Sequence, residues 1–113
     1  MFDYANTLLE KGGYTNLTDE ERIEVDAMAM NELRRIRDGL LKETDKYSIS
    51  DFPMNDADRT AITKYRQDLR DLPESQTPMF QEDGGQILRN ITWPSNSLVT
   101  DDVFHKYAPF AIN

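Results

Sequence analysis

The sequence has no cysteine and a single histidine among its 113 residues. Without cysteine the chain forms no disulfide bond and no thiolate metal site, and one histidine cannot build a multi-histidine metal centre. The chain also lacks a phosphate-binding loop, a dinucleotide fingerprint and a Ser–His–Asp order. We therefore expect a protein that is not an enzyme and that uses no metal and no cofactor.

Long apolar runs and an excess of positive charge are missing as well. No apolar stretch approaches the ~18–20 residues that span a bilayer, and the first residues do not resemble a secretory signal. The chain carries 13 Lys and Arg against 21 Asp and Glu, which gives a net charge of −8. Nucleic acids bind cationic surfaces. The sequence thus favours a partner that is neither nucleic acid nor membrane.

Apolar residues are sparse for a chain of this length, which is one domain at most. They make up 38% of the sequence, and the mean hydropathy is −0.71. Small chains bury a low share of their surface and often depend on partners for stability. We expect a homo- or hetero-oligomer.

Residues 18–44 carry the clearest helical pattern. Thr18 and Glu21 match a capping box, with acidic residues near the start and basic residues near the end, as the helix dipole favours. Apolar residues form two stripes on this helix, which together need more than one packing partner. The long stripe holds Val25, Ala29, Leu33, Ile36 and Leu40, and the shorter one holds Ile23, Met30 and Leu41. Gly39 marks either a close crossing of helices or an early end of this helix.

A second helix is expected from the Asn55 cap to about Asp71, with Pro73 stopping it and forcing Leu72 out of the helical region. The helical period places one group of residues on its apolar side: Ala61, Ile62, Tyr65, Leu69 and Leu72. Three arginines follow a neighbouring stripe: Arg59, Arg66 and Arg70. The connection holds Tyr47, Ile49, Phe52 and Met54, which we expect to cover the open end of the pair.

These elements predict a mainly α fold, an antiparallel two-helix hairpin over residues 18–73 with extended N- and C-terminal arms. The N-terminal arm, residues 1–17, is either mobile or docks on a neighbour, and Gly12-Gly13 would stop any short helix in it. Residues 74–113 form an irregular C-terminal arm with a possible short strand at 87–93 and a turn after Thr100.

The candidate binding residues each allow two interpretations. The arginine stripe either pairs with acids such as Asp45 or Asp51, or grips an acidic partner. Trp93 either fills the core or, with Pro94, anchors an interface. The cluster of Asp101, Asp102 and His105 is typical of a capped turn with a surface histidine rather than a metal site.

Several short motifs, in chain order, resemble the small phage tail assembly chaperone family over about residues 34–94. They include Arg37-Asp38, Thr44-Asp45 and Ser50-Asp51, the closing Trp93-Pro94, and the specific block from Tyr65 through Arg66-Gln67 and Leu69-Arg70-Asp71-Leu72 to Pro73. The chain departs from the family pattern at Lys46 and Ile62, where tryptophan is usual.

This resemblance implies a tail or tail-fibre assembly factor that binds a phage structural protein in the host cytoplasm, without enzymatic activity. The alternative is a tail or capsid accessory component retained in the mature virion, whose arms bury their aromatic residues against neighbours. The partners would be phage tail, fibre or other virion proteins. The predicted partner-binding residues are Arg59, Tyr65, Arg66, Arg70, Asp71, Trp93, Pro94, Phe104, Tyr107 and Phe110.

Overall fold

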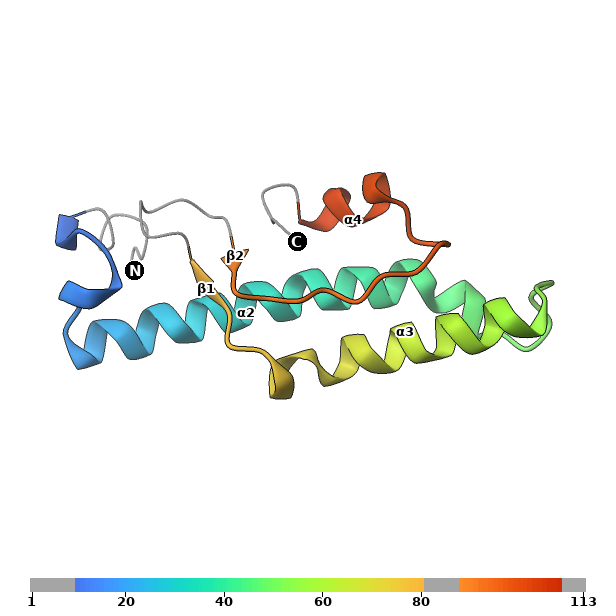
Figure 1. Cartoon of the computed structure of the whole chain (residues 1–113), viewed down its shortest axis with the longest axis horizontal. Helices are drawn as coiled ribbons and strands as arrows, with labels where there is room; N and C mark the ends of the chain where they lie inside the picture. The colour runs from blue at the N-terminus through green and yellow to red at the C-terminus, as the bar shows by residue number, and fades with distance from the viewer. Residues whose placement is uncertain (1–9, 81–87, 109–113) are drawn as a thin grey trace.

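Helices make up most of the computed structural model, which describes residues 10–80 and 88–108 (Figure 1). A two-stranded antiparallel sheet and two short 3₁₀ turns complete this part of the chain. The elements are η1 (Tyr14–Asn16), α2 (Asp19–Thr44), η2 (Asp45–Ser48), α3 (Asp56–Ser75), β1 (Met79–Phe80), β2 (Leu88–Arg89) and α4 (Asp101–Tyr107). The mainly helical class expected from the sequence is confirmed.

Helix α2 begins and ends where the sequence predicts. The Thr18 hydroxyl accepts a bond from the Glu21 N–H at 3.1 Å, and the Thr18 N–H donates to the Glu21 carboxylate at 3.0 Å. This capping box satisfies donors that the first helical turn leaves free. All five residues of the predicted long stripe are buried: Val25, Ala29, Leu33, Ile36 and Leu40.

Helix α3 lies antiparallel beside α2 (Figure 1). The Asn55 side chain caps it by accepting a bond from the Asp58 N–H at 2.7 Å. The expected apolar side is buried apart from Ala61, which is exposed. The buried residues of α3 pack against the long stripe of α2 and form one core with it.

Pro73 does not end α3, contrary to the prediction from sequence. The helix continues to Ser75, and the Gln76 N–H donates to the Leu72 carbonyl at 3.0 Å, so Leu72 keeps its helical role. The φ angle of proline is compatible with a helix, and what proline removes is one N–H bond to the preceding turn. Near a helix end that loss is tolerated.

Residues 88–108 do not form the extended arm that the sequence suggested. After β2, Asn90 adopts a φ of 64° and redirects the chain, a conformation that asparagine tolerates better than most residues. Residues 91–97, called the strap below, then run along the helix pair with Ile91 and Trp93 buried on either side of exposed Thr92 (Figure 1). The predicted strand over 87–93 is reduced to Leu88–Arg89, and its partner β1 was not foreseen.

Helix α4 returns along α2 and covers a stripe of residues four apart. Arg35 donates to the Tyr107 carbonyl at 2.8 Å, and the Tyr107 hydroxyl donates to Glu43 at 2.8 Å. Between them, a Cβ at Gly39 would overlap the Tyr107 ring. Gly39 therefore marks a close crossing of helices, one of the two predicted alternatives. Tyr107 and Phe104 pack on the core of their own chain.

The described part of the N-terminal arm also packs on the core. Tyr14 is buried, and its hydroxyl accepts a bond from the Phe80 N–H. Gly12 and Gly13 have φ angles of 76° and 113°, and the helical residues before them end there, as predicted. The predictions for Phe110 and for the first nine residues lie outside the described residues.

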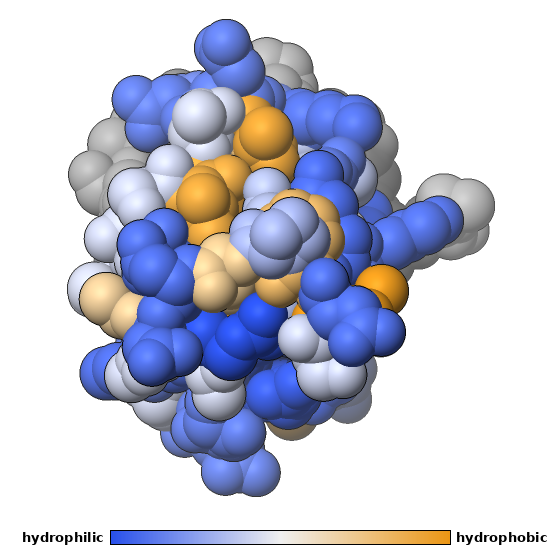
Figure 2. Space-filling model, turned by 90° about the vertical axis from the view of Figure 1, so that its right-hand side faces the viewer, coloured by the Kyte–Doolittle hydropathy of each residue, from blue (hydrophilic) through white to orange (hydrophobic). Residues whose placement is uncertain are grey.

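The end of the molecule that carries the connection, the hairpin tip, presents apolar atoms to the surface. Figure 2 views this end and shows apolar residues gathered among hydrophilic ones. Tyr47 and Met54 pack against the core, as expected, and the Tyr47 and Phe52 rings meet edge-on at 5.0 Å. Ile49 is 57% exposed and does not cover the tip. In the second stripe of α2, Ile23 is exposed while Met30 and Leu41 pack partly on the core.

The close crossing at Gly39 predicts a change of sign in a double-mutant cycle. In the natural chain, Gly39→Ala should lower the free energy of unfolding by about 1–3 kcal/mol, because the added methyl group displaces Tyr107 and α4. In a Tyr107→Ala background the same change should raise it by about 0.5–1 kcal/mol, because alanine favours the helix. Urea denaturation of the four proteins measures both effects, and the same sign in both backgrounds would contradict the crossing.

Candidate functional site

Two hollows flank α3, one on each side of its buried stripe. The first lies between α3 and the strap, and the second between α3 and the connection. Together they gather most of the residues that the sequence singled out.

The first hollow, called the strap groove below, is the larger. Its main part has a volume of about 690 Å³ and is lined by Ala61, Lys64, Tyr65, Asp68, Pro94, Ser95, Asn96, Ser97, Val99 and Asp101. A smaller part of about 140 Å³ adds Phe104 and His105, and a part of about 360 Å³ beside the end of α3 adds Asp71 and Trp93. The groove thus brings the Tyr65 block and the Trp93-Pro94 motif, which are far apart in sequence, to one place.

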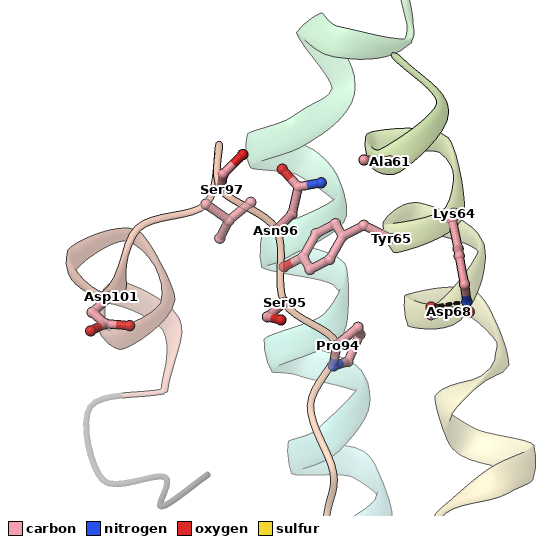
Figure 3. Close-up of a pocket in the computed structure, with 10 residues that line it drawn as sticks. Ala61, Lys64, Tyr65, Asp68, Pro94, Ser95, Asn96, Ser97 and Asp101 are labelled. Atoms are coloured by element: carbon pink, nitrogen blue, oxygen red, sulfur yellow. Dashed lines mark hydrogen bonds and ion pairs between the residues drawn. The ribbon is translucent and has the colours of Figure 1, made fainter. Parts of the chain in front are cut away.

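Tyr65 is the distinctive residue of the strap groove. Its side chain reaches from α3 to the strap, and its hydroxyl end lies beside Ser95 (Figure 3). The residue is 2% exposed, and its hydroxyl has no hydrogen-bond partner among the described residues. Burial raises the pKa of Tyr65 to about 12, so the hydroxyl keeps its proton at neutral pH. The groove therefore contains a buried donor that is not used within the described chain.

The strap is anchored at its start and free of helix hydrogen bonds further on. The Thr92 N–H donates to the Gln76 side chain at 3.0 Å, and the Trp93 ring meets the Phe104 ring edge-on at 5.5 Å. Within the described part of the chain, Ser95, Asn96 and Ser97 make no hydrogen bond to α2 or α3. Asn96 only accepts bonds from the turn that follows it, from Leu98 and Val99.

The second hollow, about 350 Å³, is lined by Arg59, Arg66 and Arg70 together with residues of the connection. Arg66 donates to the Leu41 carbonyl and the Thr44 hydroxyl, each at 2.8 Å, and to the Asp45 carboxylate at 2.9 Å. These acceptors stand at the end of α2, where carbonyl groups lack helical partners. Arg66 thus ties α3 to the end of α2, with the acid pairing that the sequence analysis named as one alternative.

The other two arginines differ in how strongly the chain holds them. Arg59 donates to the Phe52 carbonyl at 2.7 Å and also reaches the Ile49 carbonyl at 3.5 Å, so it fastens the connection. Arg70 is exposed, and in the described structure its only hydrogen bond goes to Gln67 at 3.4 Å. The guanidinium groups of Arg59 and Arg66 are therefore occupied by the fold, and only Arg70 is available.

The structure sorts the predicted partner-binding residues into three groups. The strap groove takes Tyr65, Asp71, Trp93, Pro94 and Phe104, and the arginine hollow takes Arg59, Arg66 and Arg70. Tyr107 lies apart from both, at the end of α4, where its hydroxyl donates to Glu43 of α2. The groove residues that the sequence analysis missed include Lys64, Asp68 and Ser95–Ser97. The signal available for Lys64 and Asp68 was their four-residue spacing, and they form an ion pair at 2.8 Å.

The acid–histidine cluster of the sequence is the start of a short helix. The Thr100 hydroxyl caps α4, with Asp101 and Asp102 in the first turn, and the His105 ring packs edge-on against Phe104. Among the described residues no group of acidic or histidine side chains is arranged to hold a metal ion. The helices of the described part also include none that is long and apolar enough to cross a membrane.

The bonds of the arginines predict which substitution harms the fold. Arg66→Ala should lower the free energy of unfolding by about 2 kcal/mol, because it removes three hydrogen bonds at a mostly buried guanidinium. Arg70→Ala should change it by less than about 0.5 kcal/mol, as at other exposed positions. Chemical denaturation of both variants measures these free energies of unfolding. Equal losses for the two variants would contradict the conclusion that the fold holds Arg66 and leaves Arg70 available.

The comparisons with known proteins agree with the resemblance in the motifs. The model of the phage tail assembly chaperone protein family matches residues 30–96. No curated protein and no solved structure shows a significant match to the chain. The matched range includes most of α2, the connection, all of α3 and the strap as far as Asn96. Since this is more than half of the sequence, the chain belongs to the phage tail assembly chaperone family.

Proposed function

We propose that this protein is a non-enzymatic assembly factor that binds a structural protein of the phage tail or tail fibre in the host cytoplasm. The observation that carries the proposal is the family match over residues 30–96. This range contributes most residues of the main part of the strap groove, from Ala61 on α3 to Asn96 on the strap. The family match and the main part of the strap groove thus share most of their residues.

The character of the groove suits protein binding rather than catalysis. Its main part is lined by hydroxyl, amide and apolar side chains, the Lys64–Asp68 ion pair and the Asp101 carboxylate. A lining of this kind supplies hydrogen bonds and contact area but no nucleophile activated by a base. The net charge of −8 disfavours nucleic acid as the cargo.

The alternative, a component retained in the virion, stays a prediction with less support. It rested on aromatic residues in the arms that would be buried against neighbouring subunits. In the structure Phe104 and Tyr107, two of these residues, pack partly on the core of their own chain. Outside the described residues lie the others, Phe2, Tyr4 and Phe110, together with Leu8 and Leu9 of the N-terminal arm. The expectation of an oligomer also stays a prediction, with Ile23, 68% exposed, as the apolar residue of α2 available for such a contact.

Co-expression tests the proposed function. The full chain, carrying an affinity tag, is produced with each tail and tail-fibre protein of the phage that encodes it, and with the major head protein as a control. We expect one tail or fibre protein to co-purify and to accumulate in higher soluble yield than when it is produced alone. The head protein should do neither.

The same partner then separates assembly factor from virion component. Mass spectrometry of purified particles should detect the tail protein and not this chain. If no tail or fibre protein binds the chain, the proposed function is wrong. If one binds and the chain remains in the particle at a fixed ratio, the virion alternative replaces it.

A further inference from the structure

We infer that the strap groove binds an extended segment of the partner, one free of acidic residues, and that a backbone carbonyl of this segment accepts a hydrogen bond from the Tyr65 hydroxyl. The inference rests on the proposed function and names the site and the chemistry of the partner. It starts from the buried hydroxyl that has no partner among the described residues.

A buried hydroxyl without a hydrogen bond is costly to the free protein. Removing such a group from water without a compensating bond destabilises a fold, whereas phenylalanine would fill the same space without that cost. Within the described chain the Tyr65 hydroxyl makes no hydrogen bond, and the ring of Tyr65 alone accounts for its packing in the core. A hydrogen bond that the Tyr65 hydroxyl forms only when the partner is bound would offset this cost in the complex.

The strap is the element that lets a partner reach Tyr65. Ser95 lies beside the hydroxyl (Figure 3), and Ser95, Asn96 and Ser97 make no hydrogen bonds to α2 or α3 in the described chain, while buried Trp93 holds the start of the strap. A small outward shift of these residues breaks none of the hydrogen bonds that fasten the fold. The same shift exposes the Tyr65 hydroxyl and the N–H groups of the strap to an extended peptide lying in the groove.

The charges of the groove select against an acidic segment. Lys64 is neutralised by Asp68, with 2.8 Å between their charged atoms. Asp101 lines the main part and Asp71 the part beside the end of α3, and neither forms an ion pair within the described chain. A carboxylate in the groove would meet these negative charges. A neutral backbone carbonyl would not, and it is a suitable acceptor for a phenol hydroxyl.

Two pairs of variants of the full chain test the inference against the tail or fibre protein found by co-expression. Tyr65→Phe removes the hydroxyl, and Tyr107→Phe makes the same change at the end of α4, at a residue that lines no part of the groove. Ala61→Gln places a longer side chain at an exposed position in the groove, and Ala27→Gln makes the same change at an exposed position of α2 that lines neither hollow. Calorimetry measures Kd for each, and thermal unfolding measures Tm.

We expect Tyr65→Phe to raise Kd about five- to tenfold, the effect of one hydrogen bond, while its Tm equals or exceeds that of the natural chain. Ala61→Gln should raise Kd by at least as much. Tyr107→Phe and Ala27→Gln should leave Kd unchanged. The combination of weaker binding with undiminished stability is what a purely structural tyrosine would not give.

Two results would overturn the inference. One is an unchanged Kd for both groove variants, which leaves the proposed function standing and places the partner elsewhere. The other is a clear fall in the Tm of Tyr65→Phe, which would show that the hydroxyl is bonded in the free protein. If no tail or fibre protein binds even the natural chain, the proposed function itself fails, and the inference fails with it.

Discussion

Burial of the apolar face of α2 is the interaction on which the rest of this structure depends. Helix α3, both strands and α4 all pack against α2. Each large apolar side chain buried there contributes roughly 1.5–3 kcal/mol, and few other sources of stability are present in a chain without disulfides. Helix α3 covers one side of α2 and α4 covers another. The strap connects β2 to α4 along the helix pair and makes few hydrogen bonds to the helices. The strap groove follows from that arrangement.

The two flanks of α3 differ in how the described fold uses their polar side chains. On one flank, Arg66 and Arg59 donate to carbonyl groups at the end of α2 and in the connection, which fixes where α3 starts relative to α2. On the other flank, Tyr65 places a hydroxyl under the strap with no described acceptor. The family motif contains Tyr65 and Arg66. It therefore combines an arginine that stabilises the fold with a tyrosine whose hydroxyl has no acceptor in the described chain.

The sequence predicted the parts of the fold that local chemistry decides. The Thr18 capping box, the Asn55 cap and the buried stripe of α2 depend on residues close together in the chain, and the structure confirms them. The strap, the β1–β2 pair and the return of α4 depend on contacts between distant residues, which periodicity does not reveal. Gly39 left two alternatives open because only its contact with Tyr107 distinguishes them. The groove shares this limit, since Tyr65 and Pro94 meet only after the strap has folded back.

Hydrogen exchange, measured by mass spectrometry on the full chain alone and in complex with its tail protein, tests the central claim most directly. If the partner lies in the strap groove, backbone exchange should change in the strap, where Ser95–Ser97 lack helix hydrogen bonds in the free protein. The connection at the hairpin tip should keep the exchange rates of the free chain. Protection confined to the hairpin tip, with the strap unchanged, would contradict the account.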